Sequence, residues 1–199
     1  YLGMFFLLFS GLCDTFDGKV ARTKKDRTPQ MKKFGIQIDS LSDLIAFGIL
    51  PACIGIAMLR YIMYIPDLSG FTKYILTHYN LQAQIVLTAI AVLYVLAAMI
   101  RLAYFNVMEE ERQSKTEENR KTYEGLPVTS VSLILPLFYS FRRDIGRIFP
   151  DLYAFLLLII AIAFVTRIKL KKPKMKTMLI FVGVGGLEFL WLLFKYKIK

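Results

Sequence analysis

Residues 14–43 read DTFDGKVARTKKDRTPQMKKFGIQIDSLSD and carry aspartates in two groups, one at each end. Because an α-helix turns by about 100° per residue, Asp14 and Asp17 lie on one face of a helix at the start of this stretch. Three further residues share that face: Gly18, Ala21 and Arg22. At the other end, three residues follow one another along a single stripe: Gly35, Asp39 and Asp43. The stretch therefore predicts two helices, each with two carboxylates on one face.

The residues around this stretch are strongly apolar. Of 199 residues, 56% are hydrophobic, and the mean hydropathy is +0.50, whereas soluble domains contain about 45–50% apolar residues. The apolar residues gather into stretches long enough to cross a bilayer, for which about 17–25 residues suffice. We predict an all-α membrane protein, a polytopic helical bundle that forms a single domain over residues 1–199. About six spans are expected, at 1–22, 34–59, 83–107, 125–141, 151–167 and 177–195.

The basic residues border the predicted spans and indicate an orientation. The segments 19–33, 101–124 and 167–176 hold 18 of the 26 lysines and arginines, which favours a cytoplasmic location for all three. The net charge of +11 then indicates attraction to anionic lipid headgroups rather than a nucleic-acid partner. Cys13 and Cys53 are interpreted as small buried hydrophobes. His78 is expected in a polar connection, so proton transfer and metal binding fall to the carboxylates.

Four carboxylates on adjacent membrane helices need a positive partner. An ionised aspartate at membrane depth costs at least about 2.5–3.5 kcal/mol. Carboxylate oxygens favour magnesium or manganese, with calcium as a further candidate, and magnesium is commonly shared with a substrate phosphate. The spacing therefore predicts a divalent-metal site for a phosphorylated substrate. The alternatives are a proton or cation pathway in a transporter and polar contacts between helices. The small residues beside the acids suit either a closely approaching ligand or close helix packing.

Residues 14–43 resemble the signature of the CDP-alcohol phosphotransferases: Asp, two residues, Asp-Gly, two residues, Ala-Arg, a spacer, then Gly, three residues, Asp, three residues, Asp. The spacer, Thr23–Phe34, has twelve residues and is longer than usual in the family; we expect a loop between the helices to absorb the extra length. DSLSDLIAFGILPA (39–52), RLAYFN (101–106) and GLPVTS (125–130) make residues 1–140 similar to the bacterial, membrane-embedded CDP-diacylglycerol–serine O-phosphatidyltransferase branch.

The resemblance implies roles for the signature residues. Asp14, Asp17, Asp39 and Asp43 would bind divalent metal, two ions of Mg²⁺ or Mn²⁺, and Asp43 would also be the general base. The CDP group would be lined by Gly18, Ala21, Arg22 and Gly35. The implied reaction transfers a phosphatidyl group from CDP-diacylglycerol to L-serine and releases CMP. The implied protein is a homodimeric, multi-pass enzyme of the cell membrane with its active site facing the cytoplasm, and family members carry one more span ahead of the Asp-rich helix.

The acceptor alcohol is less well defined by the sequence. Arg101 and Asn106 are candidates for binding it, because they lie near the predicted cytoplasmic end of the third span. Arg101 could instead extend to the interface, and Asn106 could cap the helix. Glycerol 3-phosphate or an inositol phosphate is the alternative acceptor, for which Arg112, Arg120 and Lys121 would supply positive charge. Gly125 and Pro127 predict the start of the fourth span.

Overall fold

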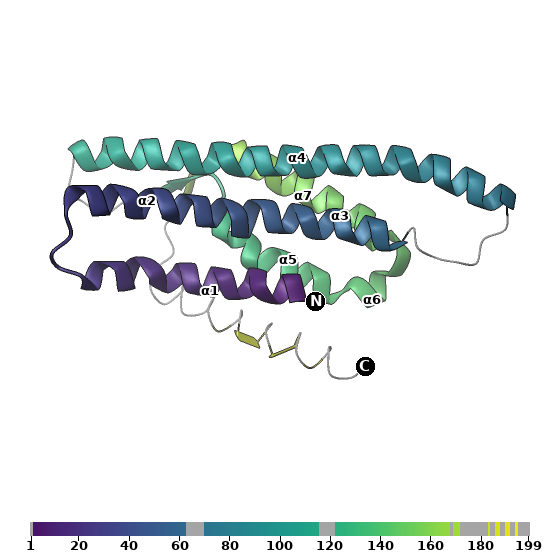
Figure 1. Ribbon diagram of the computed structural model, residues 1–199, viewed down its shortest axis with the longest axis horizontal. Coiled ribbons are helices and arrows are strands. Elements are labelled where there is room, and N and C mark those ends of the chain that lie inside the picture. The colour runs from purple at the N-terminus through teal and green to yellow at the C-terminus, as the bar shows by residue number, and fades with distance from the viewer. Residues whose placement is uncertain are drawn as a thin grey trace.

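The computed structural model describes residues 2–62, 70–115, 122–167 and 169–171, with six isolated positions between 183 and 194. The described chain is a bundle of helices that run along one another (Figure 1). The long helical elements are α1 (Leu2–Thr23), α2 (Pro29–Asp43), the π-helix η1 (Leu44–Ile49), α3 (Leu50–Ile62), α4 (Gly70–Lys115), α5 (Val131–Ser140) and α7 (Phe149–Val165). The short elements are β1 (Thr122–Glu124), η2 (Val128–Ser130), α6 (Arg142–Ile145), η3 (Gly146–Ile148) and β2 (Lys169–Lys171).

The helical architecture agrees with the sequence, and helices cover the first five predicted spans. The sixth, 177–195, lies outside the described residues except at isolated positions. Among the described residues, two helical stretches are long and apolar enough to cross a membrane, Pro29–Met58 and Gln84–Glu111. Shorter apolar helices cover Val128–Ser140 and Phe149–Val165. Large apolar side chains such as Phe6 and Leu93 are about half exposed on the outside of the bundle, where a lipid environment would cover them. Helical membrane character is therefore supported.

The connection between the first two helices is shorter than expected. Only residues 24–28 are non-helical, because Pro29 begins α2. Thr28 caps the helix through its hydroxyl, which accepts a hydrogen bond from the Met31 N–H at 3.2 Å. Proline suits the first helical position, since that N–H has no helical partner anyway. The long spacer is thus absorbed partly by about one and a half extra turns of α2, not by a loop alone.

The third long helix also exceeds its predicted bounds. α4 has 46 residues, about 69 Å at 1.5 Å per residue, which is more than twice the hydrocarbon thickness of about 30 Å. Hydropathy marks only the apolar part of such a helix, so its polar ends were not predicted. His78, expected in a connection, is helical. Cys13 and Cys53 are exposed rather than buried, because both lie on helix faces turned away from the core.

The core lies between α4, α7, η1 and α3. Its largest fully buried side chains include Tyr94, Tyr153, Phe47 and Phe149. Phe149 stacks on Phe138 with 5.0 Å between ring centroids. Aromatic packing of this kind fixes the relative rotation of the helices, and hence which face of each one is turned toward its neighbours.

A two-stranded antiparallel ribbon, which the sequence did not predict, pairs β1, which precedes α5, with β2, which follows α7. β1 pairs with β2, with Glu124 opposite Lys169. Gly125 follows β1 with φ of +80°, and a side chain there would come within 3.0 Å of the Thr166 carbonyl oxygen. Pro127 lies one residue before η2, so the predicted helix start at Gly125 and Pro127 is confirmed to within a few residues.

Candidate metal and phosphate site

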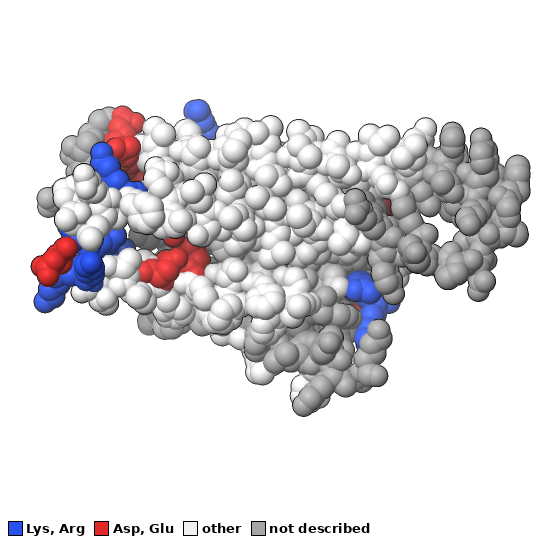
Figure 2. All heavy atoms as spheres, viewed as in Figure 1, with Lys and Arg blue, Asp and Glu red and all other residues white. Residues whose placement is uncertain are grey.

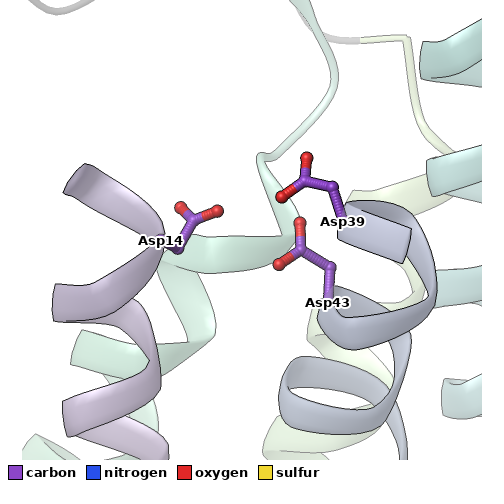
Figure 3. A group of neighbouring side chains, drawn as sticks. All are labelled: Asp14, Asp39 and Asp43. Atoms are coloured by element: carbon purple, nitrogen blue, oxygen red, sulfur yellow. The ribbon is translucent and has the colours of Figure 1, made fainter. Parts of the chain in front are cut away.

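Three aspartates from two helices converge at one point (Figure 3). Asp14 comes from α1, and Asp39 and Asp43 come from α2; one carboxylate oxygen of each lies within 4.8 Å of the others. Asp14 and Asp43 are half-buried and Asp39 is exposed. α1 and α2 are antiparallel neighbours joined by five residues, and this brings their acidic faces together. The convergence that the aspartate spacing predicted is confirmed for these three side chains.

Asp17 lies one turn beyond Asp14 on the same helix and is exposed. Its carboxyl group is close enough to that of Asp39 for the two to interact electrostatically. It also borders a shallow apolar groove along α1, together with Phe16, Val20 and Ala21. Asp17 is therefore at the rim of the carboxylate cluster rather than at its centre, and Ala21 lies beside it.

The donor set fits a hard divalent cation. The carboxylates of Asp14, Asp39 and Asp43 lie together, and negative charges this close repel one another unless a cation binds among them. Two oxygens bound to one Mg²⁺ at about 2.1 Å lie at most about 4.2 Å apart. A small rotation of the side chains would therefore bring the carboxylate oxygens from the observed separation of up to 4.8 Å to a distance at which they share one ion. These carboxylates could hold one or more such ions.

Positive charge lies at the edge of the cluster. A side chain added at Gly18 would contact the Arg22 guanidinium at 3.6 Å, and one added at Gly35 would contact Nη2 of Arg27 at 3.3 Å. Both guanidinium groups therefore lie over small residues next to the aspartates. Figure 2 shows the corresponding pattern on the surface, with acidic side chains near the end of the bundle where basic side chains gather. Such a border of cations suits a phosphate bound beside the carboxylates.

Packing between the described helices does not require Gly18 or Gly35. Among the described residues, a side chain at either position would meet only the flexible end of an arginine. By contrast, a side chain at Gly11 would overlap the buried Ser132 on α5. Gly11 thus marks a packing contact between helices, while Gly18 and Gly35 face the movable ends of arginine side chains beside the acids. This difference favours the ligand interpretation of these two glycines over the helix-packing one.

This contrast predicts opposite effects for two alanine substitutions on one helix. Gly11→Ala should destabilise the protein by about 1–3 kcal/mol, because the new methyl group overpacks the α1–α5 contact. Gly18→Ala should leave stability unchanged or raise it by up to about 1 kcal/mol through helix propensity. Apparent melting temperatures in detergent would measure both. Equal destabilisation by the two variants would show that Gly18 also serves packing.

The two acceptor candidates contact protein groups. Arg101 is 6% exposed, and it donates to the Leu126 carbonyl from Nε at 3.1 Å and to the Gly125 carbonyl from Nη2 at 3.2 Å. Arg101 thus holds the loop before α5 and does not extend to the interface. Asn106 donates from Nδ2 to the Ser40 hydroxyl at 2.7 Å, which ties α4 to the helix of the aspartates. Acceptor binding by either residue stays a prediction.

One residue near the site was not predicted from the sequence, and three candidates cannot be placed. The sequence identified Arg27 only as one of the basic residues of the segment 19–33. Its position beside Gly35 depends on the tight α1–α2 connection. Pro29 was the residue that could have indicated this connection, because it begins α2. Arg120 and Lys121 lie outside the described residues, as does the side chain of Arg112.

Fold and site together define a class: helical membrane proteins that gather carboxylates and arginines from two consecutive helices around a site for cations and phosphate. Within that class the family is given by sequence comparison. The profile of the CDP-alcohol phosphatidyltransferases matches residues 1–167, and the chain belongs to this family.

Several curated proteins are similar to this chain and share one name, CDP-diacylglycerol–serine O-phosphatidyltransferase. The protein of Saccharomyces cerevisiae is 32% identical over 150 residues, which cover 74% of this chain and 44% of the yeast protein. The Helicobacter pylori protein is 29% identical over 126 residues, 63% of this chain and 40% of that protein. The Methanocaldococcus jannaschii protein is 28% identical over 135 residues, 67% of this chain and 49% of that protein. The chain thus aligns with less than half the length of each relative.

Proposed function

We propose that this protein transfers a phosphatidyl group from CDP-diacylglycerol to L-serine, forming phosphatidylserine and releasing CMP. The observation that carries the proposal is the convergence of Asp14, Asp39 and Asp43 from two helices, because carboxylates in this arrangement can hold the cations that a pyrophosphate substrate needs. Family membership supports the use of a CDP-activated lipid. The shared name of the similar proteins supports serine as the acceptor.

Asp43 is the residue that we assign as general base. A serine hydroxyl is a poor nucleophile at neutral pH and needs a positioned proton acceptor. In the reaction, the serine oxygen forms a bond to the lipid-side phosphorus, the bond from that phosphorus to the CMP oxygen breaks, and Asp43 accepts the hydroxyl proton. Bound Mg²⁺ or Mn²⁺ would neutralise negative charge on the pyrophosphate oxygens. Asp14, Asp17 and Asp39, with Asp43, would hold these ions, two by resemblance to the family.

The CDP group would lie over Gly18 and Gly35, with Ala21 beside Asp17. The Arg22 guanidinium lies next to Gly18 and the Arg27 guanidinium next to Gly35, and a guanidinium can donate two parallel hydrogen bonds to a phosphate. A larger side chain at either glycine would occupy the volume that a flat base or a pyrophosphate needs. Gly18, Ala21, Arg22 and Gly35 are therefore proposed to line the nucleotide pocket, and Arg27 is an addition to that set.

We further propose that the chain is one domain with six membrane spans, works as a homodimer in the cell membrane and has its site on the cytoplasmic side. The basic segments 19–33, 101–124 and 167–176 support the orientation. The helices at the first five predicted spans support the span count. The resemblance to the family supports the dimer.

The decisive experiment offers serine, glycerol 3-phosphate and an inositol phosphate to the purified full chain with CDP-diacylglycerol and Mn²⁺. CMP release with serine alone would support the proposal. Release with a phosphorylated acceptor instead would keep the reaction and change its substrate. Absence of CMP release, together with cation or proton movement into proteoliposomes, would favour the transporter alternative.

Arg22→Ala should weaken the use of CDP-diacylglycerol more than the use of serine. Loss of a charge-assisted contact to a phosphate costs about 1.5–3 kcal/mol, so the KM for the lipid should rise by about tenfold or more. The KM for serine should change little. Lys24→Ala is the matched control, because Lys24 is an exposed cation of the same connection. An unchanged lipid KM in Arg22→Ala would contradict the phosphate role.

A further inference from the structure

The helix that carries Asp39 and Asp43 changes its hydrogen-bonding pattern directly after Asp43. The π-helix η1 covers Leu44–Ile49, and the Leu50 N–H donates to the carbonyl of Ile45, five residues earlier. π-helices are rare, occur mostly as single turns and are frequent at functional sites. A π turn holds about one residue more than an α turn, so the residues on its two sides are rotated relative to each other by about 100°.

A proline at residue 51 withholds one backbone donor from this segment. Pro51 has no N–H, so it cannot donate to the Phe47 carbonyl, its partner in the α pattern, or to the Ala46 carbonyl, its partner in the π pattern. Phe47 and Pro51 are both fully buried, so water cannot replace the missing donor, and an unpaired buried carbonyl is unfavourable. The Tyr94 hydroxyl on α4 donates to the Phe47 carbonyl at 2.5 Å. Tyr94 itself is 0% exposed.

The same helix, α4, holds the aspartate helix on both sides of Asp43. Asn106 donates to Ser40, three residues before Asp43, and Tyr94 donates to Phe47, four residues after it. Beside the second contact the two helices lie close, because a side chain added at Gly48 would come within 3.4 Å of the Ala98 side chain. Rotation of the segment about its own axis would therefore break at least one of these contacts.

We infer that Tyr94 is a positioning residue: its hydroxyl replaces the N–H that Pro51 lacks and fixes the π turn in the register that directs Asp43 toward Asp14. Tyr94 does not touch the carboxylate cluster, and it acts through the backbone of η1. The inference deepens the proposed function, and its kinetic test rests on that function.

The test is a double-mutant cycle. Tyr94→Phe removes the hydroxyl and should lower kcat about tenfold, with the KM for CDP-diacylglycerol changed less than twofold. Pro51→Ala restores an N–H at the helical donor position. In the Pro51→Ala background, Tyr94→Phe should therefore cost less than threefold in kcat. Tyr153→Phe is the matched control: its hydroxyl donates to the Pro51 carbonyl at 3.0 Å, an acceptor whose helical donor, the N–H of Gly55, is present. It should lower kcat less than threefold.

Additive effects in the cycle, or an unchanged kcat in Tyr94→Phe, would overturn the inference. If Tyr94→Phe fails to fold, recovery of a folded and active protein by the added Pro51→Ala change supports it, and failure of the double variant also overturns it.

Mn²⁺ binding to the same four proteins of the cycle separates this inference from the proposed function. If the wild-type chain binds Mn²⁺ without transferring a phosphatidyl group, the proposed function fails. The inference is then read from the Mn²⁺ affinity, which should fall in Tyr94→Phe and recover in the double variant. Equal affinities in all four proteins would overturn the inference, and a wild-type chain that neither transfers nor binds Mn²⁺ overturns both.

Discussion

Asp43→Asn is expected to lower kcat with serine by about 10³-fold or more, while CDP-diacylglycerol still binds. A general base contributes about 10²–10⁴-fold, and an amide of the same shape cannot accept the proton. Asp14 and Asp39 remain to hold a cation, so lipid binding should weaken far less than turnover. The carboxylate is half-buried between the two helices, and asparagine fills the same space, so the fold should be retained.

Single-turnover CMP release and equilibrium binding of CDP-diacylglycerol would separate the two effects. Asp26→Asn is the matched control, because Asp26 is an exposed aspartate in the connection between the same two helices, and it should leave both quantities unchanged. Wild-type turnover in Asp43→Asn would refute the base assignment. Loss of lipid binding and turnover to the same extent would instead make Asp43 mainly a cation ligand.

The carboxylate cluster was predictable because it depends on local geometry. The spacing of Asp39 and Asp43 by four residues fixes a shared helix face, and a short connection from the helix of Asp14 makes the two helices antiparallel neighbours. Those two facts bring the acidic faces together without knowledge of the rest of the fold. Pro29 could have refined the prediction, because a proline at that position marks a helix start and shortens the loop.

The contacts that hold the aspartate helix in place were not predictable, because they join residues that are far apart in the sequence. Pro51 indicates that one helical carbonyl lacks a donor, but no local pattern identifies Tyr94, 47 residues away from Phe47, as the replacement. Hydropathy is likewise insensitive to a change from α to π hydrogen bonding, so η1 leaves no trace in the apolar run.

Arg101 shows the same limit. An arginine at the end of an apolar stretch favours either an interfacial or a substrate-binding interpretation. The structure buries it against the carbonyls of Gly125 and Leu126. That contact depends on how the loop before α5 is held, which involves the pairing of β1 with β2, far apart in the chain. Its sequence neighbours alone could not indicate it.

Asp39→Asn is expected to change the thermal stability of the protein in opposite directions with and without metal. In EDTA the carboxylates of Asp14, Asp39 and Asp43 repel one another, and each pair of like charges at about 4 Å costs about 1 kcal/mol even in a water-like dielectric. Removing the Asp39 charge should therefore raise the apparent melting temperature in detergent. With Mn²⁺ the order should reverse, because a ligand at 100 times its Kd stabilises the wild type by about 2.7 kcal/mol and the variant has lost a ligand.

The crossing of the two melting curves is the informative result, since a purely structural role of Asp39 would move both in one direction. Asp26→Asn removes the same charge from an exposed position and should show the wild-type response to Mn²⁺ and EDTA. CMP release should depend on the metal as well. In the wild type it should disappear in EDTA and return with Mn²⁺, and in Asp39→Asn it should not return. A lower melting temperature of Asp39→Asn under both conditions would mean that the three carboxylates do not share a cation, because only a shared cation turns their mutual repulsion into stabilisation.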